Sequence, residues 1–146
     1  MFCLLANHCD ASEDKILKLL IENRSCNGCN LSKLNLGNYK LFKVDLSRAD
    51  LSESYLVNVD LGNANLSNSN LSNTYMNGAN LSEATLVKTN LSGAELELAD
   101  FSQALFVNVN LIEAYLLHAS ISEDQLNNAR LCKTVLPDAS ISYRDC

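Results

Sequence analysis

The stretch ANLSEATLVKTNLSGAELELADF, residues 79–101, has an apolar residue at every fifth position. The same spacing extends in both directions, from Leu31 to Ile121, over 19 consecutive positions. A period of five matches neither the repeat of about 3.6 residues in an α-helix nor the two-residue alternation of a long strand. Residues 31–121 are therefore expected to form an array of short repeats rather than ordinary helices or strands.

Each five-residue unit has a preferred residue at most positions. A small residue stands two places before the central apolar residue, Asn or Asp stands immediately before it, and Ser often follows, which gives the consensus A-[DN]-L-S-x. Residues two apart in extended backbone point to the same side. We therefore expect the small and central residues to point inward, the Asn or Asp to point outward, and the last two residues to turn the chain.

The central apolar side chains are predicted to fill the interior of a coil, and the small residues to let neighbouring coils approach closely. A narrow interior of this kind explains why 47% of residues are hydrophobic while only 6% are aromatic and Trp is absent. The predicted repeat core comprises Leu51, Leu56, Leu61, Leu66, Leu71, Met76, Leu81, Leu86, Leu91, Leu96, Phe101, Phe106, Leu111 and Leu116.

The outward residues indicate how many units make one coil. Tyr55, Tyr75 and Tyr115 all stand immediately before a central apolar residue, and whole multiples of four units separate them. A four-sided coil, with one unit on each side, therefore places all three tyrosines in one column. A three-sided coil does not align Tyr75 with the other two.

The chain has 146 residues, a formal charge of -6 and a sequence pI of about 4.8. This acidity argues against a nucleic-acid-binding surface, because such surfaces neutralise phosphates with Lys and Arg. The longest apolar stretch, residues 16–21, contains a lysine and is too short to cross a membrane. The first ten residues lack the basic region, apolar segment and cleavage site of a signal peptide, so none is expected in the chain as given.

On these repeats the sequence resembles the pentapeptide-repeat family. The match covers about two-thirds of the chain and includes the flanks: Cys26 to Ser32 resembles the start of the first coil in members abundant in cyanobacteria, and Leu136 to Cys146 resembles their tail. Ala139 stands where those tails have glycine. The resemblance implies an all-β solenoid, a right-handed quadrilateral β-helix with four pentapeptides in each coil.

A single domain, 1–146, is predicted, with short helices covering both ends. The N-terminal segment, 1–25, contains an apolar helical face at 12–22, where Asp10 and Glu13 can begin a helix. The β-helix is expected over 26–122. At Asp124 a carboxylate would have to enter the core, so the repeat is expected to give way to a helix at about 123–129 and a non-repeat cap.

Cys26 and Cys29 form a CxxC pair, which admits three interpretations. Redox chemistry needs a helix N-terminus that nothing here supplies, and zinc needs two more ligands, for which Cys3, His8 and Cys9 are the candidates. The favoured interpretation is that both are small core residues at the first corner, because they occupy the central and small-residue positions of the repeat.

The family resemblance implies a further pairing, a disulfide between Cys132 and Cys146 that closes the C-terminal cap. A bond here favours an oxidising compartment, such as a periplasm or a thylakoid lumen. The alternative is two reduced thiols in a cytoplasmic protein. The sequence leaves both open.

No enzymatic activity, cofactor, metal or small-molecule substrate is predicted. His8 and His118, the two histidines, lie far apart in the sequence, and no motif places a nucleophile beside either. Glu95 and Glu97 point outward on one side, but on a convex wall rather than in a cleft. Solvated carboxylates are the simpler interpretation of that pair.

We therefore expect the function to reside on the surface of the protein. The protein is predicted to be a monomeric structural or protein-interaction module. Its expected partner is an unknown protein, and no membrane binding is expected. Residues 50–124 contain ten acidic side chains against Lys88, a net charge of -9, whereas Lys33, Lys40, Lys43 and Arg48 lie on the first coil. Exposed aromatic residues on one wall favour a partner-binding patch, although stacked tyrosines can also simply stabilise neighbouring rungs. The candidate patch comprises Tyr55, Val57, Tyr75, Tyr115 and Leu117.

The alternative function comes from the resemblance alone. Quinolone-resistance members of the family resemble B-DNA in shape and charge and occupy the DNA site of type II topoisomerases. Mimicry of this kind requires regular columns of carboxylates. The column through Asp60, Asn80, Asp100 and Ser120 is acidic only at alternate coils, so a DNA mimic is the second hypothesis.

Overall fold

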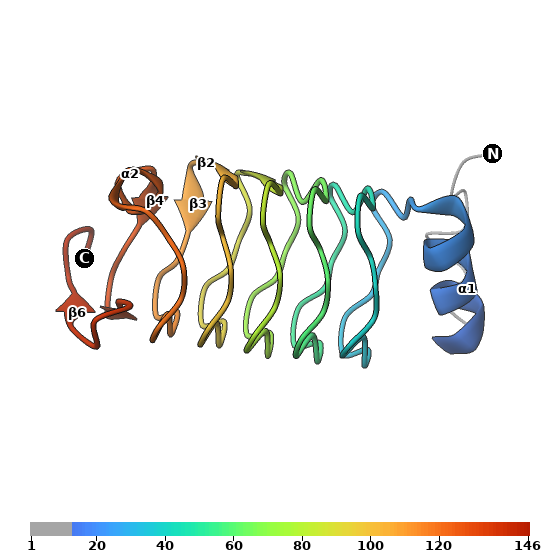
Figure 1. The fold of residues 1–146 in the computed structure, drawn as a ribbon, viewed down its shortest axis with the longest axis horizontal. Helices are drawn as coiled ribbons and strands as arrows, with labels where there is room; N and C mark the ends of the chain where they lie inside the picture. Colours follow the sequence, from blue (N-terminus) through green and yellow to red (C-terminus); the bar gives the residue numbers. More distant parts are fainter. Residues whose placement is uncertain (1–12) are drawn as a thin grey trace.

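In the computed structural model, which describes residues 13–146, the chain is a right-handed β-helix solenoid. Its coils stack along the long axis, with helix α1 (Glu13–Asn23) at one end and strand β6 (Ile141–Ser142) near the other (Figure 1). Between them lie β1 (Thr85–Val87), β2 (Leu105–Val107), β3 (Val109–Asn110), α2 (Glu123–Asn127), β4 (Ala129–Arg130) and β5 (Thr134–Val135).

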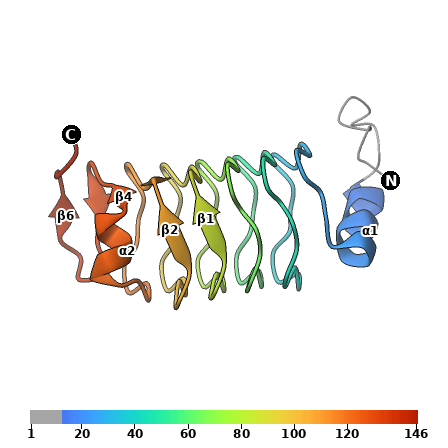
Figure 2. The same cartoon turned by 90° about the horizontal axis from the view of Figure 1, so that it is seen from above.

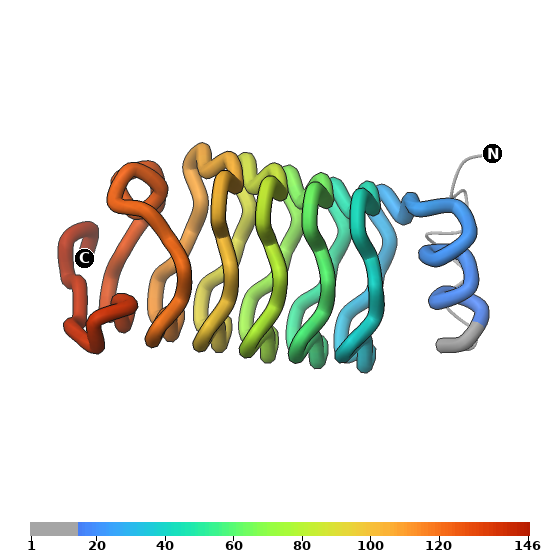
Figure 3. Tube along the Cα trace, in the orientation of Figure 1, coloured from blue at the N-terminus to red at the C-terminus, as the bar shows by residue number. Residues whose placement is uncertain are grey.

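Neighbouring coils pair in parallel through residues that are four units apart in the sequence. Strands β1 and β2 lie side by side in this way (Figure 2). In this pair, Thr85 is opposite Leu105. Most other rungs are single bridges with the same spacing, such as Asp50 opposite Asn70. The strands are short because each five-residue unit turns soon after its central residue. The result is the regular stack of coils in Figure 3. Bridged residues are four units apart, which is the spacing that Tyr55, Tyr75 and Tyr115 indicated.

The turns use the second residue after each central position. Glu53, Asn58 and Asn73 occupy this position with φ of 57°, 55° and 55°, in the left-handed region. The turn closes with a backbone hydrogen bond, as from the amide of Ala64 to the carbonyl of Leu61 at 3.0 Å. Asn and Gly adopt left-handed backbone more easily than other residues. This explains why that position of the unit is so often Asn.

The inward positions form one continuous core. The central side chains from Leu31 to Leu116 are buried, as are the small residues beside them, among them Ala49, Ala64 and Ala94. Near the C-terminal end, the rings of Phe101 and Phe106 meet edge to face with centroids 5.3 Å apart. Full burial of one leucine contributes roughly 1.5–3 kcal/mol.

The outward Asn and Asp residues link successive coils. The side-chain amide of Asn90 donates to Oδ1 of Asn70 at 3.1 Å, and that of Asn110 donates to Oδ1 of Asn90 at 3.0 Å. The same oxygens accept from the backbone two residues further on, as from the amide of Ser72 to Asn70 at 3.2 Å. The outward column is thus a hydrogen-bonded ladder and not merely a solvated face.

Helix α1 lies beyond the first coil at the N-terminal end (Figure 1). It spans Glu13–Asn23, where the sequence predicted 12–22. Leu17 and Leu20 are buried and belong to the same hydrophobic cluster as the coils. The candidate helix start at Asp10 and the candidate zinc ligands Cys3, His8 and Cys9 lie outside the described residues.

At the C-terminal end, α2 replaces one side of a coil. Ser122 caps the helix, and the side-chain amide of Gln125 donates to the carbonyls of Phe101 and Ala104 at 2.8 Å each. The helix ends at Asn127, shorter than the predicted 123–129, because Ala129 returns to the repeat register and pairs with Val109. Pairing continues with Tyr115 opposite Val135, so the repeat register extends beyond 122, its predicted end.

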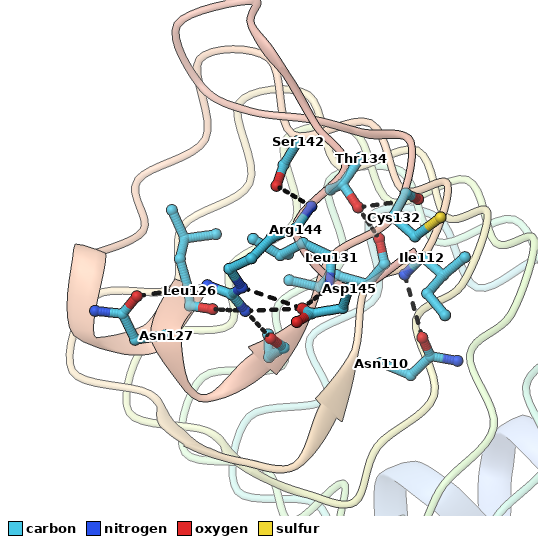
Figure 4. A network of polar contacts seen from close by, with 12 residues as sticks. Asn110, Ile112, Leu126, Asn127, Leu131, Cys132, Thr134, Ser142, Arg144 and Asp145 are labelled. Atoms are coloured by element: carbon cyan, nitrogen blue, oxygen red, sulfur yellow. Dashed lines mark hydrogen bonds and ion pairs between the residues drawn. The ribbon is translucent and has the colours of Figure 1, made fainter.

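The last residues fold back onto this coil. Strand β6 pairs antiparallel with β5, and Arg144 binds the carbonyls of Leu126 and Ala129 while its guanidinium pairs with Asp145 at 3.0 Å (Figure 4). Oδ2 of Asp145 also accepts from the amide of Leu131 at 2.8 Å. Together, the hydrogen bonds from Arg144 and Leu131 lower the pKa of Asp145 below its ordinary value of 3.8.

Two cysteine pairs lie at disulfide distance. The sulfurs of Cys132 and Cys146 are 2.07 Å apart, the pairing that the family resemblance implied. Those of Cys26 and Cys29 are 2.00 Å apart. Both residues of the CxxC pair are buried, as the favoured interpretation predicted, but that interpretation did not include a bond between them.

Candidate interaction surface

Within residues 13–146 no group of three or more His, Cys, Asp or Glu side chains is placed to hold a metal ion. His118 is exposed at a turn with φ of 57°. Over the same residues, no helix has the length and apolar character needed to cross a membrane.

The structure brings the three tyrosines into one column together with Glu95. Tyr55 is opposite Tyr75, Tyr75 is opposite Glu95, and Glu95 is opposite Tyr115. The tyrosines are 46%, 48% and 38% exposed in chain order, and each precedes a central residue that is buried. The column therefore presents aromatic rings to solvent on one side of the solenoid.

A second column, two residues further along each unit, lies beside the first. Val57 and Leu117 belong to it and are half-buried, as is Glu97. Two side chains of the first column, Glu95 and Tyr55, lean toward the second column of the preceding coil. The amide of Asn77 lies 3.4 Å from Oε2 of Glu95, and a Cβ added to Gly37 would meet the ring of Tyr55 at 2.8 Å. Gly37 thus leaves room for the Tyr55 ring.

Leu98 is a member of this surface that the sequence interpretation missed. Its side chain is 63% exposed and its backbone has φ of 59°. The corresponding turn residues of the two preceding coils are Asn58 and Gly78, which suit left-handed backbone. An exposed leucine in this position gains little from burial and costs backbone energy. A leucine at the turn position of the repeat was the available signal.

We call this surface the tyrosine face. It comprises Tyr55, Val57, Tyr75, Glu95, Glu97, Leu98, Tyr115 and Leu117.

The carboxylates elsewhere on the solenoid are largely occupied. Glu53 pairs with Lys33 at 3.6 Å, and Glu113 pairs with Lys133 at 3.7 Å. Oδ1 of Asp60 accepts a hydrogen bond of 2.9 Å from the side-chain amide of Asn80. Oδ1 of Asp100 accepts one of 2.8 Å from the backbone amide of Ser102. Asp50 has the same role in its ladder. Much of the negative charge is therefore bound to the framework and not displayed in free columns.

The basic residues of the first coil do not form a single face. Lys33 pairs with Glu53, and the ammonium of Lys43 lies 5.1 Å from the centroid of the Phe42 ring. Lys40 is opposite Asp60 in the next coil. The backbone amide of Arg48 donates to the carbonyl of Ser67, in another column of that coil. The positive charge therefore surrounds the N-terminal coil.

A smaller apolar area lies on the strands β1 and β2. Leu105 is 52% exposed and Val107 is 36% exposed, beside the half-buried Thr85 and Val87. This area carries no aromatic residue. It was not identified from the sequence, although these residues occupy outward positions that hold Asn, Asp or Ser in most other units.

Comparison with known proteins identifies the family. A model of pentapeptide repeats matches the chain in eight copies, over residues 25–56, 45–82, 54–93, 64–103 and 94–136. The chain belongs to the pentapeptide repeat family. Among curated proteins, none matches this pentapeptide repeat protein by sequence.

Solved structures of cyanobacterial pentapeptide repeat proteins are similar to this one. Rfr23 from Cyanothece 51142 is 32% identical, with 73% of this chain and 86% of Rfr23 covered and a TM-score of 0.71. HetL from Nostoc sp. strain PCC 7120 is 26% identical, with 89% of this chain and 62% of HetL covered and a TM-score of 0.58. HetL is described as involved in the regulation of heterocyst differentiation.

The fluoroquinolone resistance protein QnrB1 is a more distant match. It is 17% identical, with 67% of this chain and 59% of QnrB1 covered and a TM-score of 0.32.

Proposed function

We propose that this pentapeptide repeat protein is a non-catalytic scaffold that binds another protein through the tyrosine face. The observation that carries the proposal is the column of Tyr75, Glu95 and Tyr115, in which both tyrosines are exposed. Leu98, three residues after Glu95, is also exposed and has left-handed backbone. Tyr is enriched in protein interfaces because it combines a large apolar surface with a polar end. An interface role explains why these residues occupy outward positions.

The proposal includes a specific shape for the scaffold. Each coil is a quadrilateral of four pentapeptides, which the regular spacing of the bridges supports. The single domain 1–146 is closed by α1, where Leu17 and Leu20 are buried, and by the tail that Cys146 ties to Cys132. Covered ends block the pairing of coil edges between copies, so the protein acts as a monomer. Its disulfides suit an oxidising compartment.

The simplest alternative for the tyrosines is that they only stabilise the rungs. For Tyr55 this has support, because the ring packs over Gly37. Tyr75 and Tyr115 have larger residues, Val57 and Glu97, at the corresponding places of the preceding coils. These two tyrosines are therefore the better probes of binding.

Affinity capture from native cells, with melting temperatures measured in parallel, tests the proposed function. The parent should capture a protein that the variant Tyr75→Ser/Tyr115→Ser does not, while that variant melts within a few degrees of the parent. Tyr143→Ser is the matched control, since Tyr143 is 63% exposed at the C-terminal end, and it should capture normally. Equal capture by the double variant, or lost stability with unchanged capture, contradicts the proposal.

A DNA mimic that inhibits a type II topoisomerase is the second candidate. The net charge of -9 over residues 50–124 favours it, whereas the use of Asp50, Asp60 and Asp100 in framework hydrogen bonds weighs against it. A supercoiling assay with purified topoisomerase decides between them. Inhibition at sub-micromolar protein would reverse the order of the two candidates.

A further inference from the structure

We propose that the tyrosine face receives an arginine side chain of a basic protein segment, seated between Tyr75 and Tyr115 and above Glu95 and Glu97. This inference rests on the proposed function and names the chemistry of its partner. Three features support it. Tyr75, Glu95 and Tyr115 lie on three successive rungs, Glu95 and Glu97 place two negative charges on the middle rung, and Leu98 lies beside these carboxylates.

The spacing of the rungs suits a cation. Tyr75, Glu95 and Tyr115 are consecutive in one parallel column, and neighbouring strands lie about 4.8 Å apart. The two tyrosines are thus separated by about 10 Å, with the glutamate midway between them. A cation placed over Glu95 lies one rung from each tyrosine, so that either ring can turn its face toward it, and aromatic faces attract cations within about 6 Å of the ring centroid.

The two carboxylates are adjacent and lack a basic partner within residues 13–146. Glu95 and Glu97 flank the fully buried Leu96 and therefore point outward together. Glu53 and Glu113, in another column, each have a lysine one coil away. The corresponding neighbours of Glu95 are tyrosines, so the described chain supplies no cation for this pair.

Hydrogen bonds with Asn77 position Glu95 and Glu97. The amide of Glu97 donates to Oδ1 of Asn77 at 3.0 Å, and the side-chain amide of Asn77 lies 3.4 Å from Oε2 of Glu95. Asn77 thus orients the carboxylate of Glu95 from the preceding coil. Both glutamates keep oxygens for a ligand, since a carboxylate accepts several hydrogen bonds.

Leu98 provides an apolar edge beside the carboxylates. It follows Glu97 directly, is 63% exposed, and is fixed by a 3.0 Å hydrogen bond from its amide to the carbonyl of Leu117. The aliphatic stem of an arginine packs against surfaces of this kind while its charged head reaches polar groups. A leucine in left-handed backbone is thereby explained by what it contacts in the complex.

Charge selects the class of partner. An apolar partner would have to desolvate two like charges without compensation, and an acidic partner or a nucleic acid would be repelled. A basic segment is attracted by the acidic coil body as well as by this site. Arginine fits better than lysine, because its planar guanidinium stacks on aromatic rings and binds carboxylates through two hydrogen bonds.

Chemical-shift mapping with a peptide of defined sequence tests the inference without the natural partner. Isotope-labelled protein is titrated with acetyl-Gly-Arg-Gly-Gly-Arg-Gly-amide at about 50 mM salt, where screening is moderate. The same peptide with citrulline in place of arginine is the neutral control. The arginine peptide should shift the amides of Tyr75, Glu95, Glu97, Leu98 and Tyr115, and the citrulline peptide should leave them unchanged.

Variants separate this site from general attraction to an acidic protein. Glu95→Gln/Glu97→Gln should weaken binding by about tenfold, and Tyr75→Leu/Tyr115→Leu by about fivefold, as expected for loss of two charges and of two cation–π contacts. Glu83→Gln removes an exposed carboxylate in another column and should change affinity less than about twofold. Shifts spread over all acidic columns, equal binding of the citrulline peptide, or no binding would overturn the inference.

The inference and the proposed function can fail separately. If a natural partner requires Tyr75 and Tyr115 but still binds Glu95→Gln/Glu97→Gln at parental affinity, the tyrosine face is an interface and the arginine site is wrong. If the variant Tyr75→Ser/Tyr115→Ser captures the partner as well as the parent does, the proposed function is wrong. Site-specific binding of the arginine peptide in that second case would still establish the chemistry of the site.

Discussion

The side-chain amide of Asn70 donates a hydrogen bond of 3.1 Å to Oδ1 of Asp50, one coil before it. The direction is the same at each step of the ladder, from Asn110 to Asn90 to Asn70 to Asp50. An ionised aspartate accepts hydrogen bonds and cannot donate them. Aspartate is therefore suited to the N-terminal end of a ladder, where Asp45, Asp50 and Asp60 stand.

Asn90→Asp should destabilise the fold by about 1–3 kcal/mol, because the donor to Asn70 is lost and a carboxylate faces the oxygen of Asn70. Ionisation of the new carboxyl group is unfavourable there, so the deficit should shrink as the pH falls and the group is protonated. Urea unfolding at several pH values measures the effect. Asn68→Asp, at an exposed turn, is the control and should cost much less. Equal effects at both sites would show that the ladder contributes little.

Leu98→Asn should raise stability by about 0.5–1 kcal/mol, because Asn accommodates left-handed backbone better and little buried surface is lost. The same change should weaken binding at the tyrosine face. Urea midpoints and capture of the partner measure the two effects. Leu105→Asn is a control of similar exposure outside the left-handed positions and should not stabilise. A destabilised Leu98→Asn variant would show that the leucine is structural.

The C-terminal tail should respond to acid. Hydrogen bonds from Arg144 and Leu131 lower the pKa of Asp145 in the folded protein, so their stabilising contribution is present above the ordinary value of 3.8 and is lost as the pH falls through the lowered value. Hydrogen exchange of residues 141–146 should accelerate over that range while the coils remain protected. In Asp145→Asn the tail should exchange faster at neutral pH and show a flatter pH dependence. Acid opening that begins in the coils instead would contradict this account.

Cys132→Ser should free the tail without unfolding the solenoid. The bond between Cys132 and Cys146 joins positions 14 apart in the sequence, and closure of such a loop is worth about 3 kcal/mol in the entropic model. Limited proteolysis should then cut after residue 136 and leave the coils intact. The bond between Cys26 and Cys29 joins positions only three apart, so Cys26→Ser/Cys29→Ser is expected to cost less, about 2 kcal/mol. Cleavage within the coils of Cys132→Ser would contradict the expectation.

The sequence predicts this fold well because apolar residues such as Leu81, Leu86 and Leu91 recur at every fifth position. A regularly repeating coil is sufficient to bury all of them. The tyrosine column follows from the same period. The bond between Cys26 and Cys29 does not, because the two positions also suit unbonded core residues. The pairing of Ala129 with Val109, which resumes the repeat register, could not be predicted either, since it depends on α2 replacing one side of a coil.

The candidate site was predictable only in part. Tyr55, Tyr75 and Tyr115 share a position in the repeat and could be placed on one face from spacing alone. The role of Asn77 in holding Glu95 and Glu97 depends on how side chains lean between coils, which no sequence period records. A leucine at a turn position was a signal in the sequence, but Leu98 was overlooked because its exposure and its left-handed backbone are seen only in the structure.

Hydrogen exchange of the complex with the captured partner tests the central claim most directly. If the tyrosine face is the interface, binding should slow exchange at the amides of Tyr75, Glu97, Leu98 and Tyr115 and leave strand β2 and the chain ends unchanged. Protection centred on Leu105 and Val107, or on the C-terminal tail, would contradict the account and place the interface elsewhere on the solenoid.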